Sequence, residues 1–69
     1  MKYVLLTNPH NNKDLLINLS LVTAIEEQMN GTKIWTNRRV YEVKESFQEV
    51  TLLINEIQME RESINSYSM

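Results

Sequence analysis

Few side chains of this sequence could carry out a reaction. The chain has no cysteine and one histidine, His10, which stands in a turn-forming run at residues 8–12 with no second kind of metal ligand at a suitable spacing. Ser20 and Ser46 could act as nucleophiles only beside an activating base, and neither has a histidine partner. We therefore expect His10 to be a solvated loop residue.

The acidic residues do not predict an acid–base pair. Glu26 and Glu27 are adjacent in an expected strand, where successive side chains point to opposite faces. A second group of acids is typical of a solvated helix face: Glu56, Glu60 and Glu62. The chain has one glycine and so no glycine-rich phosphate loop. We predict that the protein is not an enzyme and uses no cofactor or metal.

Length and composition limit the remaining functions. The 69 residues suffice for one small domain, and a chain of this size without disulfides often gains stability by self-association. The net charge is −2, with seven Lys and Arg among nine acids, which argues against unaided binding to nucleic-acid phosphates. No apolar run reaches the length of a membrane span, about 18 residues, and the first residues lack the pattern of a signal peptide. We expect a cytoplasmic location.

Four or five short strands are expected before a helix. Residues 3–7 and 15–19 are apolar runs on either side of the turn cluster at 8–12, which predicts a hairpin. Because these leucine-rich runs do not alternate, we expect both faces of the hairpin to be covered, as in a small curled sheet or partial barrel. A short helical turn at residues 19–22 then leads to a third strand at residues 23–29.

Two turns of two residues each define how the later strands pair. Asn30-Gly31 is the strongest hairpin signal, because both residues tolerate the positive φ of a type I′ turn. Asn37-Arg38 has the same spacing, but arginine in a left-handed conformation carries a steric cost. The resulting register pairs Met29 with Thr32, Glu27 with Ile34, Thr36 with Arg39, Trp35 with Val40 and Lys33 with Glu42.

This register divides the side chains between two faces. One face is the candidate for the core: Ile25, Met29, Ile34, Tyr41 and Val43. The other face carries Ala24, Trp35 and Val40 among the charged residues Glu26, Lys33 and Glu42. The tryptophan leaves two alternatives. Either the first hairpin curls over this face and covers Trp35, or Trp35 is an exposed anchor for a partner or a second copy.

An amphipathic helix is expected to complete the domain. Ser46 and Glu49 form a capping box, in which each side chain satisfies a free backbone N–H of the helix start. A stripe with i, i+3, i+4, i+7 spacing is expected to cover the sheet: Phe47, Val50, Leu53, Ile54 and Ile57. Leu52 and Met59 lie on the opposite side, either as isolated apolar residues or as a helix-pairing seam. The domain should span residues 1–62, followed by a polar, frayed tail at residues 63–69.

These elements predict an α+β domain. We expect a curled antiparallel sheet of four or five strands with one C-terminal helix packed on it. The function we expect is protein–protein interaction, with self-association as a homo-oligomer. The candidate interaction surface comprises Trp35, Val40, Ala24, Leu52 and Met59.

Two segments between residues 17 and 57 carry a family pattern. The first is formed by Asn18, Val22, Ile25 and Glu26, and the second by Thr36, Asn37, Tyr41, Val43, Lys44, Glu45, Ser46, Glu49 and Val50. In these segments the chain resembles the small flagellar proteins of the FlbD/SwrD type, with Arg38 where the family has glycine. The resemblance implies a small cytoplasmic accessory protein of flagellar motor assembly or power, without catalytic residues.

Two other interpretations stay open. Phage and mobile-element proteins of unknown role can have the same layout. LytTR-type DNA-binding modules also combine short strands, a hairpin and a following helix, and they bind DNA through basic loops. The candidates for such contacts here are Lys13, Lys33, Arg38 and Arg39. The acidic net charge and the short length argue against the DNA-binding alternative.

Overall fold

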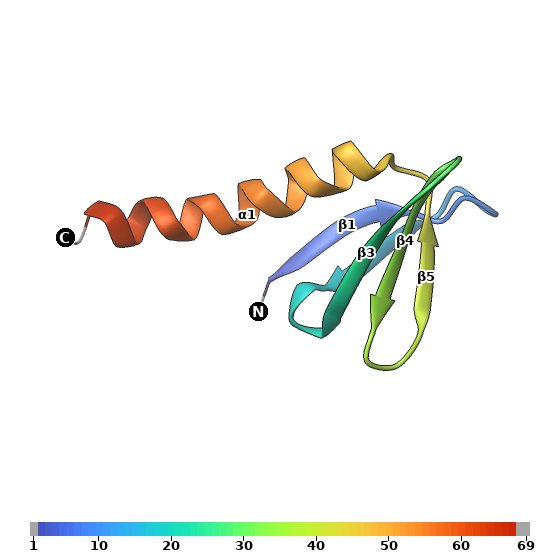
Figure 1. Ribbon diagram of the computed structural model, residues 1–69, viewed down its shortest axis with the longest axis horizontal. Coiled ribbons are helices and arrows are strands. Elements are labelled where there is room, and N and C mark those ends of the chain that lie inside the picture. Colours follow the sequence, from blue (N-terminus) through green and yellow to red (C-terminus); the bar gives the residue numbers. More distant parts are fainter. Residues whose placement is uncertain (1, 68–69) are drawn as a thin grey trace.

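A computed structural model describes the backbone of residues 2–67 and the side chains of residues 2–57 (Figure 1). The elements are β1 (Tyr3–Thr7), β2 (Asp14–Asn18), the 3-10 helix η1 (Leu19–Leu21), β3 (Val22–Gln28), β4 (Gly31–Thr36), β5 (Val40–Val43) and α1 (Phe47–Tyr67). The pair β1-β2 forms one antiparallel sheet, and β3-β4-β5 forms another. The α+β class and the single C-terminal helix packed on the sheet are confirmed. The strands, however, divide between two sheets instead of forming one.

The first hairpin forms as the sequence predicts, and its register places Leu6 opposite Leu15. Its loop is closed by a hydrogen bond from the Asn8 N–H to the Lys13 carbonyl (2.8 Å) and by one from the Asn12 N–H to the Asn8 carbonyl (2.9 Å). Asn12 has a φ of 58°, in the left-handed region that asparagine tolerates better than most residues. The asparagine-rich run therefore forms a compact turn, as expected.

The hairpin is covered on one face only, so the expectation of two covered faces is wrong. Val4, Leu6 and Ile17 are buried, whereas the side chains between them along the strands are exposed. The alternation of a strand sends neighbouring side chains to opposite faces whatever their hydrophobicity. A run of leucines hides that alternation in the sequence, although the backbone still imposes it.

The turn between β3 and β4 consists of Met29 and Asn30, one residue earlier than predicted. Gln28 pairs with Gly31 and Ile25 with Ile34, so the register differs by two residues from the predicted one. A register shift of two residues keeps every paired side chain on its predicted face. Met29, however, was predicted to lie in the core and is 100% exposed. Gly31 takes the last position of the turn with a φ of 116°, and a Cβ there would collide with the Val43 carbonyl oxygen.

The turn between β4 and β5 has the predicted register, with a hydrogen bond from the Thr36 N–H to the Arg39 carbonyl (3.0 Å). The Thr36 hydroxyl accepts from the N–H groups of Arg38 (3.3 Å) and Arg39 (3.1 Å) and donates to the Arg39 carbonyl (2.7 Å). Among the described non-glycine residues, positive φ occurs at Asn12 alone. Arg38 is therefore not left-handed, and the expected steric cost is absent.

The helix begins at the predicted residue, but the Glu49 carboxylate accepts from the Ser46 hydroxyl and not, as predicted, from a backbone N–H. The Glu49 N–H donates to the Ser46 hydroxyl oxygen (3.1 Å), the Val50 N–H donates to the Ser46 carbonyl (2.9 Å), and the Ser46 hydroxyl lies 3.4 Å from the Glu49 carboxylate, to which it donates. α1 contacts β1, β3 and β4. Figure 1 shows it starting beside the ends of β1 and β5. Helical backbone continues to Tyr67, through most of the segment assigned to a tail. The predicted fraying of that tail stays a prediction.

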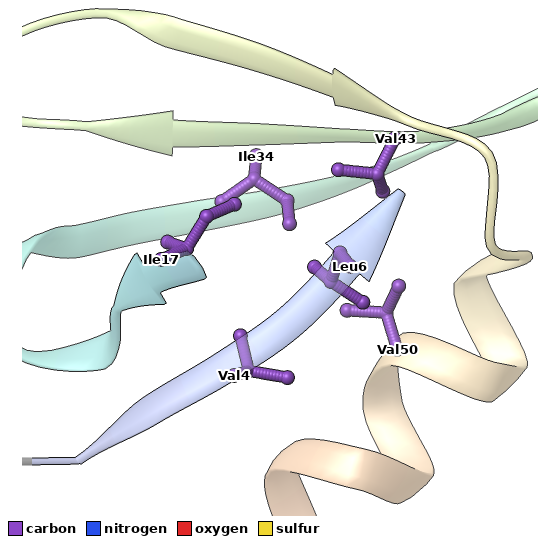
Figure 2. Packing of buried hydrophobic residues seen from close by; sticks show 6 residues of the cluster. All are labelled: Val4, Leu6, Ile17, Ile34, Val43 and Val50. Carbon is purple, nitrogen blue, oxygen red and sulfur yellow. The ribbon is translucent and has the colours of Figure 1, made fainter. Parts of the chain in front are cut away.

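The core joins all three parts of the fold. Figure 2 shows its buried side chains, which come from the hairpin (Val4, Leu6, Ile17), the three-stranded sheet (Ile34, Val43) and the helix (Val50). The predicted core face of the sheet is confirmed for Ile25, Ile34, Tyr41 and Val43, which are buried or packed against this cluster. The helix stripe is confirmed for Val50, which is fully buried, and for Leu53, Ile54 and Ile57, which pack on the cluster. Phe47, the first residue of the predicted stripe, is half-buried and is not part of this cluster.

The helix cap can be tested by removing its hydroxyl group. Ser46→Ala should lower the free energy of unfolding by about 1 kcal/mol, because the Glu49 N–H loses its acceptor. Gln48→Ala, at an exposed position in the same turn, serves as control and should change stability by less than about 0.5 kcal/mol. Equal melting temperatures for Ser46→Ala and the wild type would show that the cap does not stabilise the helix.

A methyl group at Gly31 tests the close approach of β4 and β5. Gly31→Ala should destabilise the protein by about 1–3 kcal/mol, since alanine is strained at this φ and its Cβ meets the Val43 carbonyl. Asn30→Ala, at the exposed neighbouring turn position, should cost less. Urea unfolding measures both. If Gly31→Ala were as stable as the wild type, the turn would have to be built differently.

The second turn gives an independent test of backbone conformation. Arg38→Gly should destabilise the protein by about 0.4–1 kcal/mol, because glycine adds freedom to the unfolded chain and relieves no positive φ. Thermal unfolding of the variant and of Arg38→Ala gives the comparison, with alanine expected to be nearly neutral. A gain in stability for glycine alone would place Arg38 in the left-handed region after all.

Candidate interaction surface

Three apolar residues lie in one row across the outer face of the three-stranded sheet. Ala24 pairs with Trp35, and Trp35 pairs with Val40, so their side chains lie side by side on the face opposite to the core. All three are exposed, with Trp35 at 41% and Val40 at 38%. We call this row the tryptophan face. Of the two alternatives for Trp35, covering by the first hairpin is wrong, and the structure shows an exposed aromatic side chain.

The indole of Trp35 is held in place by its neighbours. Its Nε1–H donates to the carboxylate of Glu26 (3.2 Å), and the Lys33 ammonium lies 5.8 Å from the ring centroid. Glu26, Lys33 and Glu42 form the adjacent row across the three strands, with opposite charges side by side. A side chain fixed in this way loses little conformational entropy when a partner covers it, which favours binding.

A second exposed apolar group lies on the outer face of the hairpin. Leu5 and Leu16 are paired directly and are 57% and 64% exposed, and Tyr3 on the same face is 45% exposed. We call these three residues the hairpin face. The sequence reasoning missed it because both runs were assigned to a covered strand. The predicted hairpin pairing could have revealed this face. If Val4 and Ile17 point into the core, their neighbours along the strands must point outward.

The two helix residues of the predicted surface do not join the tryptophan face. Leu52 is 55% exposed on α1, and α1 packs on the core side of the sheet, opposite to Trp35. The side chain of Met59 lies outside the described residues, so the seam predicted for Leu52 and Met59 stays a prediction. The structure thus brings together Trp35, Val40 and Ala24 and leaves Leu52 apart from them.

Two hollows, of about 410 and 510 Å³, are lined by residues of both β2 and β5. The first is bordered by Leu16, Ile17 and Asn18 of β2, by Tyr41 of β5 and by Tyr3, Leu21, Thr36, Arg38 and Arg39. The second is bordered by Leu15 of β2, by Val40, Tyr41 and Glu42 of β5 and by Asn8, His10, Lys33, Trp35 and Arg39. Arg39 and Tyr41 border both, with the guanidinium 5.0 Å from the ring centroid. We call the two hollows together the β2–β5 groove.

The residues considered for chemistry take part in local structure. His10 is exposed in the hairpin loop, where its N–H donates to the Asn8 side chain (2.9 Å). The Ser20 hydroxyl donates to the side chain of Asn18 (2.7 Å), and Ser46 caps the helix. Among the described residues no three His, Asp or Glu side chains lie close enough together to hold a metal ion.

The basic residues considered for DNA contacts are divided. Lys33, Arg38 and Arg39 border the β2–β5 groove, whereas Lys13 lies in the exposed hairpin loop and borders neither hollow. As far as the structure describes the chain, no helix combines the length and the apolar character of a membrane span. The resemblance of residues 17–57 to the FlbD/SwrD type stays a prediction, since no family model, curated protein or solved structure matches the chain.

Proposed function

We propose that this protein is a non-enzymatic interaction protein that binds other proteins and associates with itself. The observation that carries this proposal is the tryptophan face, a row of exposed apolar side chains centred on Trp35. Tryptophan is enriched among the residues that contribute most to protein–protein binding, and contiguous exposed apolar residues mark such surfaces. The helix and the hairpin both lie on the other side of this sheet and leave the face open.

The charges beside this face support the proposed self-association. In a two-fold dimer the same patch meets itself, so each group must find its complement on the second copy. Trp35 and Val40 supply an apolar centre, and the next row alternates in sign through Glu26, Lys33 and Glu42. An antiparallel arrangement of two copies can therefore place Lys33 of one near a glutamate of the other. Such complementary charges fix the orientation of an interface more than its strength.

The biological setting is proposed from the resemblance. The matching segments within residues 17–57 support a cytoplasmic accessory role in flagellar motor assembly or power. A phage or mobile-element protein with the same layout is the alternative, and the exposed faces serve an interaction role equally in either setting. The genes that neighbour the coding sequence distinguish the two, since a flagellar operon and a prophage cassette differ in content.

Light scattering on the wild type and on the variants Trp35→Lys, Leu52→Lys and Leu5→Lys tests self-association. The wild type should be a dimer or higher oligomer at micromolar concentration, and Trp35→Lys should raise the dissociation constant about 30-fold, the effect expected for a residue that contributes about 2 kcal/mol to binding. Leu52→Lys, at an exposed helix position away from the tryptophan face, is the matched control and should leave the oligomer intact. Circular dichroism confirms that each variant is folded.

Two results would contradict this assignment. A wild type that stays monomeric at high micromolar concentration removes self-association. If the oligomer persists in Trp35→Lys but dissociates in Leu5→Lys, the protein self-associates through the hairpin face and not through the tryptophan face. Leu5 is more exposed than Trp35.

A further inference from the structure

The strand β5 has an edge that pairs with no other strand of the described residues. β5 is the last strand of the order β3-β4-β5. The Thr36 N–H donates to the Arg39 carbonyl, and hydrogen-bonded pairs alternate with unbonded ones along an antiparallel ladder. Tyr41 and Val43 therefore direct their backbone groups to β4. The backbone N–H and C=O groups of Val40 and Glu42 point away from β4, toward the β2–β5 groove.

The strand β2 borders the groove from the other side and is also an edge strand. The Leu19 N–H donates to the Lys2 carbonyl (2.9 Å), and the Asn8 N–H donates to the Lys13 carbonyl (2.8 Å). By the same alternation, Leu15 and Ile17 bond to β1, and the backbone groups of Leu16 point to the free edge. Two rows of backbone donors and acceptors thus border the groove.

The groove has a different charge from the rest of the molecule. Its charged lining residues are three cations, Lys33, Arg38 and Arg39, and one anion, Glu42, whereas the whole chain has a net charge of −2. Lys33 and Arg39 lie over the rings of Trp35 and Tyr41. Arg39 is exposed and Lys33 is half-buried, so both can meet a carboxylate that approaches from solvent.

Apolar side chains also line the groove. Leu16 and Tyr41 border the first hollow, and Leu15, Trp35 and Val40 border the second. An added strand directs alternate side chains to opposite faces, so one set of its side chains can contact apolar lining residues while the other set meets the arginines. Backbone pairing then supplies affinity, and the alternating pockets supply specificity.

We propose that the β2–β5 groove binds an extended segment of a partner protein, in which acidic residues alternate with apolar ones, and that this segment pairs with the free edge of β5. The inference rests on the proposed interaction function and adds the chemistry of the partner. A second copy of this chain fits less well, because pairing through the same edge would bring the arginines of both copies into one groove. Duplex DNA fits less well because Glu42 and the apolar side chains of Leu15, Trp35 and Val40 belong to the lining.

Selection from a displayed library of random twelve-residue peptides tests the proposal on the full chain. The immobilised wild type should enrich peptides of net negative charge with apolar residues at every second position. A representative peptide, synthesised with a fluorescent label, then gives dissociation constants by anisotropy for the wild type and its variants. The same titration with a twenty-base-pair duplex, at two salt concentrations, measures DNA binding.

Two kinds of variant separate backbone pairing from charge. Val40→Pro removes the backbone N–H that points into the groove, and it leaves the hydrogen bonds between β5 and β4 intact. The variant should therefore stay folded and bind the peptide at least about tenfold more weakly. Arg38→Glu combined with Arg39→Glu reverses two exposed charges and should also weaken binding at least about tenfold. Lys13→Glu makes the same charge change at an exposed residue outside both hollows and should leave affinity within about twofold.

Each outcome supports or overturns the inference. Acidic peptides whose binding depends on both the edge and the arginines support it. The inference is overturned if no peptides are enriched over a blank surface, if the enriched peptides have no acidic bias, or if the double variant Arg38→Glu/Arg39→Glu binds them as tightly as the wild type. The double variant gives this test even if Val40→Pro does not fold. If no peptide binds, and if the duplex binds the wild type but not the double variant, the inference is overturned and the ligand of the groove is nucleic acid. If peptides fail but the wild type is a Trp35-dependent oligomer, the inference fails and the proposed function stands.

Discussion

The placement of all three parts of this fold depends on a short segment after β5. The carboxylate of Glu45 accepts from both the N–H (2.9 Å) and the hydroxyl (2.8 Å) of Thr7, and the Lys44 N–H donates to the Thr7 carbonyl (2.8 Å). The Glu45 carbonyl in turn accepts from the buried Thr32 hydroxyl (2.8 Å). Hydrogen bonds to a charged group contribute about 1.5–3 kcal/mol each when partly buried. Because Ser46 starts the helix directly afterwards, the same segment fixes the hairpin on the sheet and sets where α1 begins.

This arrangement explains why a small protein leaves so much apolar surface open. The segment brings one face of the hairpin and one face of the sheet together, and the single apolar stripe of α1 closes the space between them. No further described element remains to cover the two outer faces, so Leu5, Leu16 and Trp35 stay exposed. A core of this size stabilises a domain only marginally, and burying the outer faces against another protein adds to it. We therefore expect the proposed interactions to stabilise this domain.

Features encoded in neighbouring residues could be predicted from the sequence. The cap at Ser46, the helix stripe and the pairing of Thr36 with Arg39 all depend on residues a few positions apart. The β3–β4 turn lies one residue earlier than predicted because Gly31 is needed where the Val43 carbonyl approaches. No local sequence pattern reveals this contact between strands. The exposed hairpin face was hidden because its residues are as apolar as the buried ones. The β2–β5 groove required knowledge of how the two sheets meet, which depends on the long-range contact between Thr7 and Glu45.

Val40 connects the two proposed binding surfaces. Its side chain belongs to the tryptophan face, and its backbone groups face the β2–β5 groove, since strand side chains project perpendicular to the direction of backbone pairing. Trp35 likewise contributes to the tryptophan face and borders the second hollow. A strand added to β5 would extend the sheet beside this face and change the surface that a second copy meets. If peptide binding changes the affinity of one copy for another, self-association must change the affinity for the peptide by the same factor, because the two equilibria are thermodynamically linked. We therefore expect the two proposed surfaces, which share residues of one small sheet, to be coupled without a conformational change in the domain.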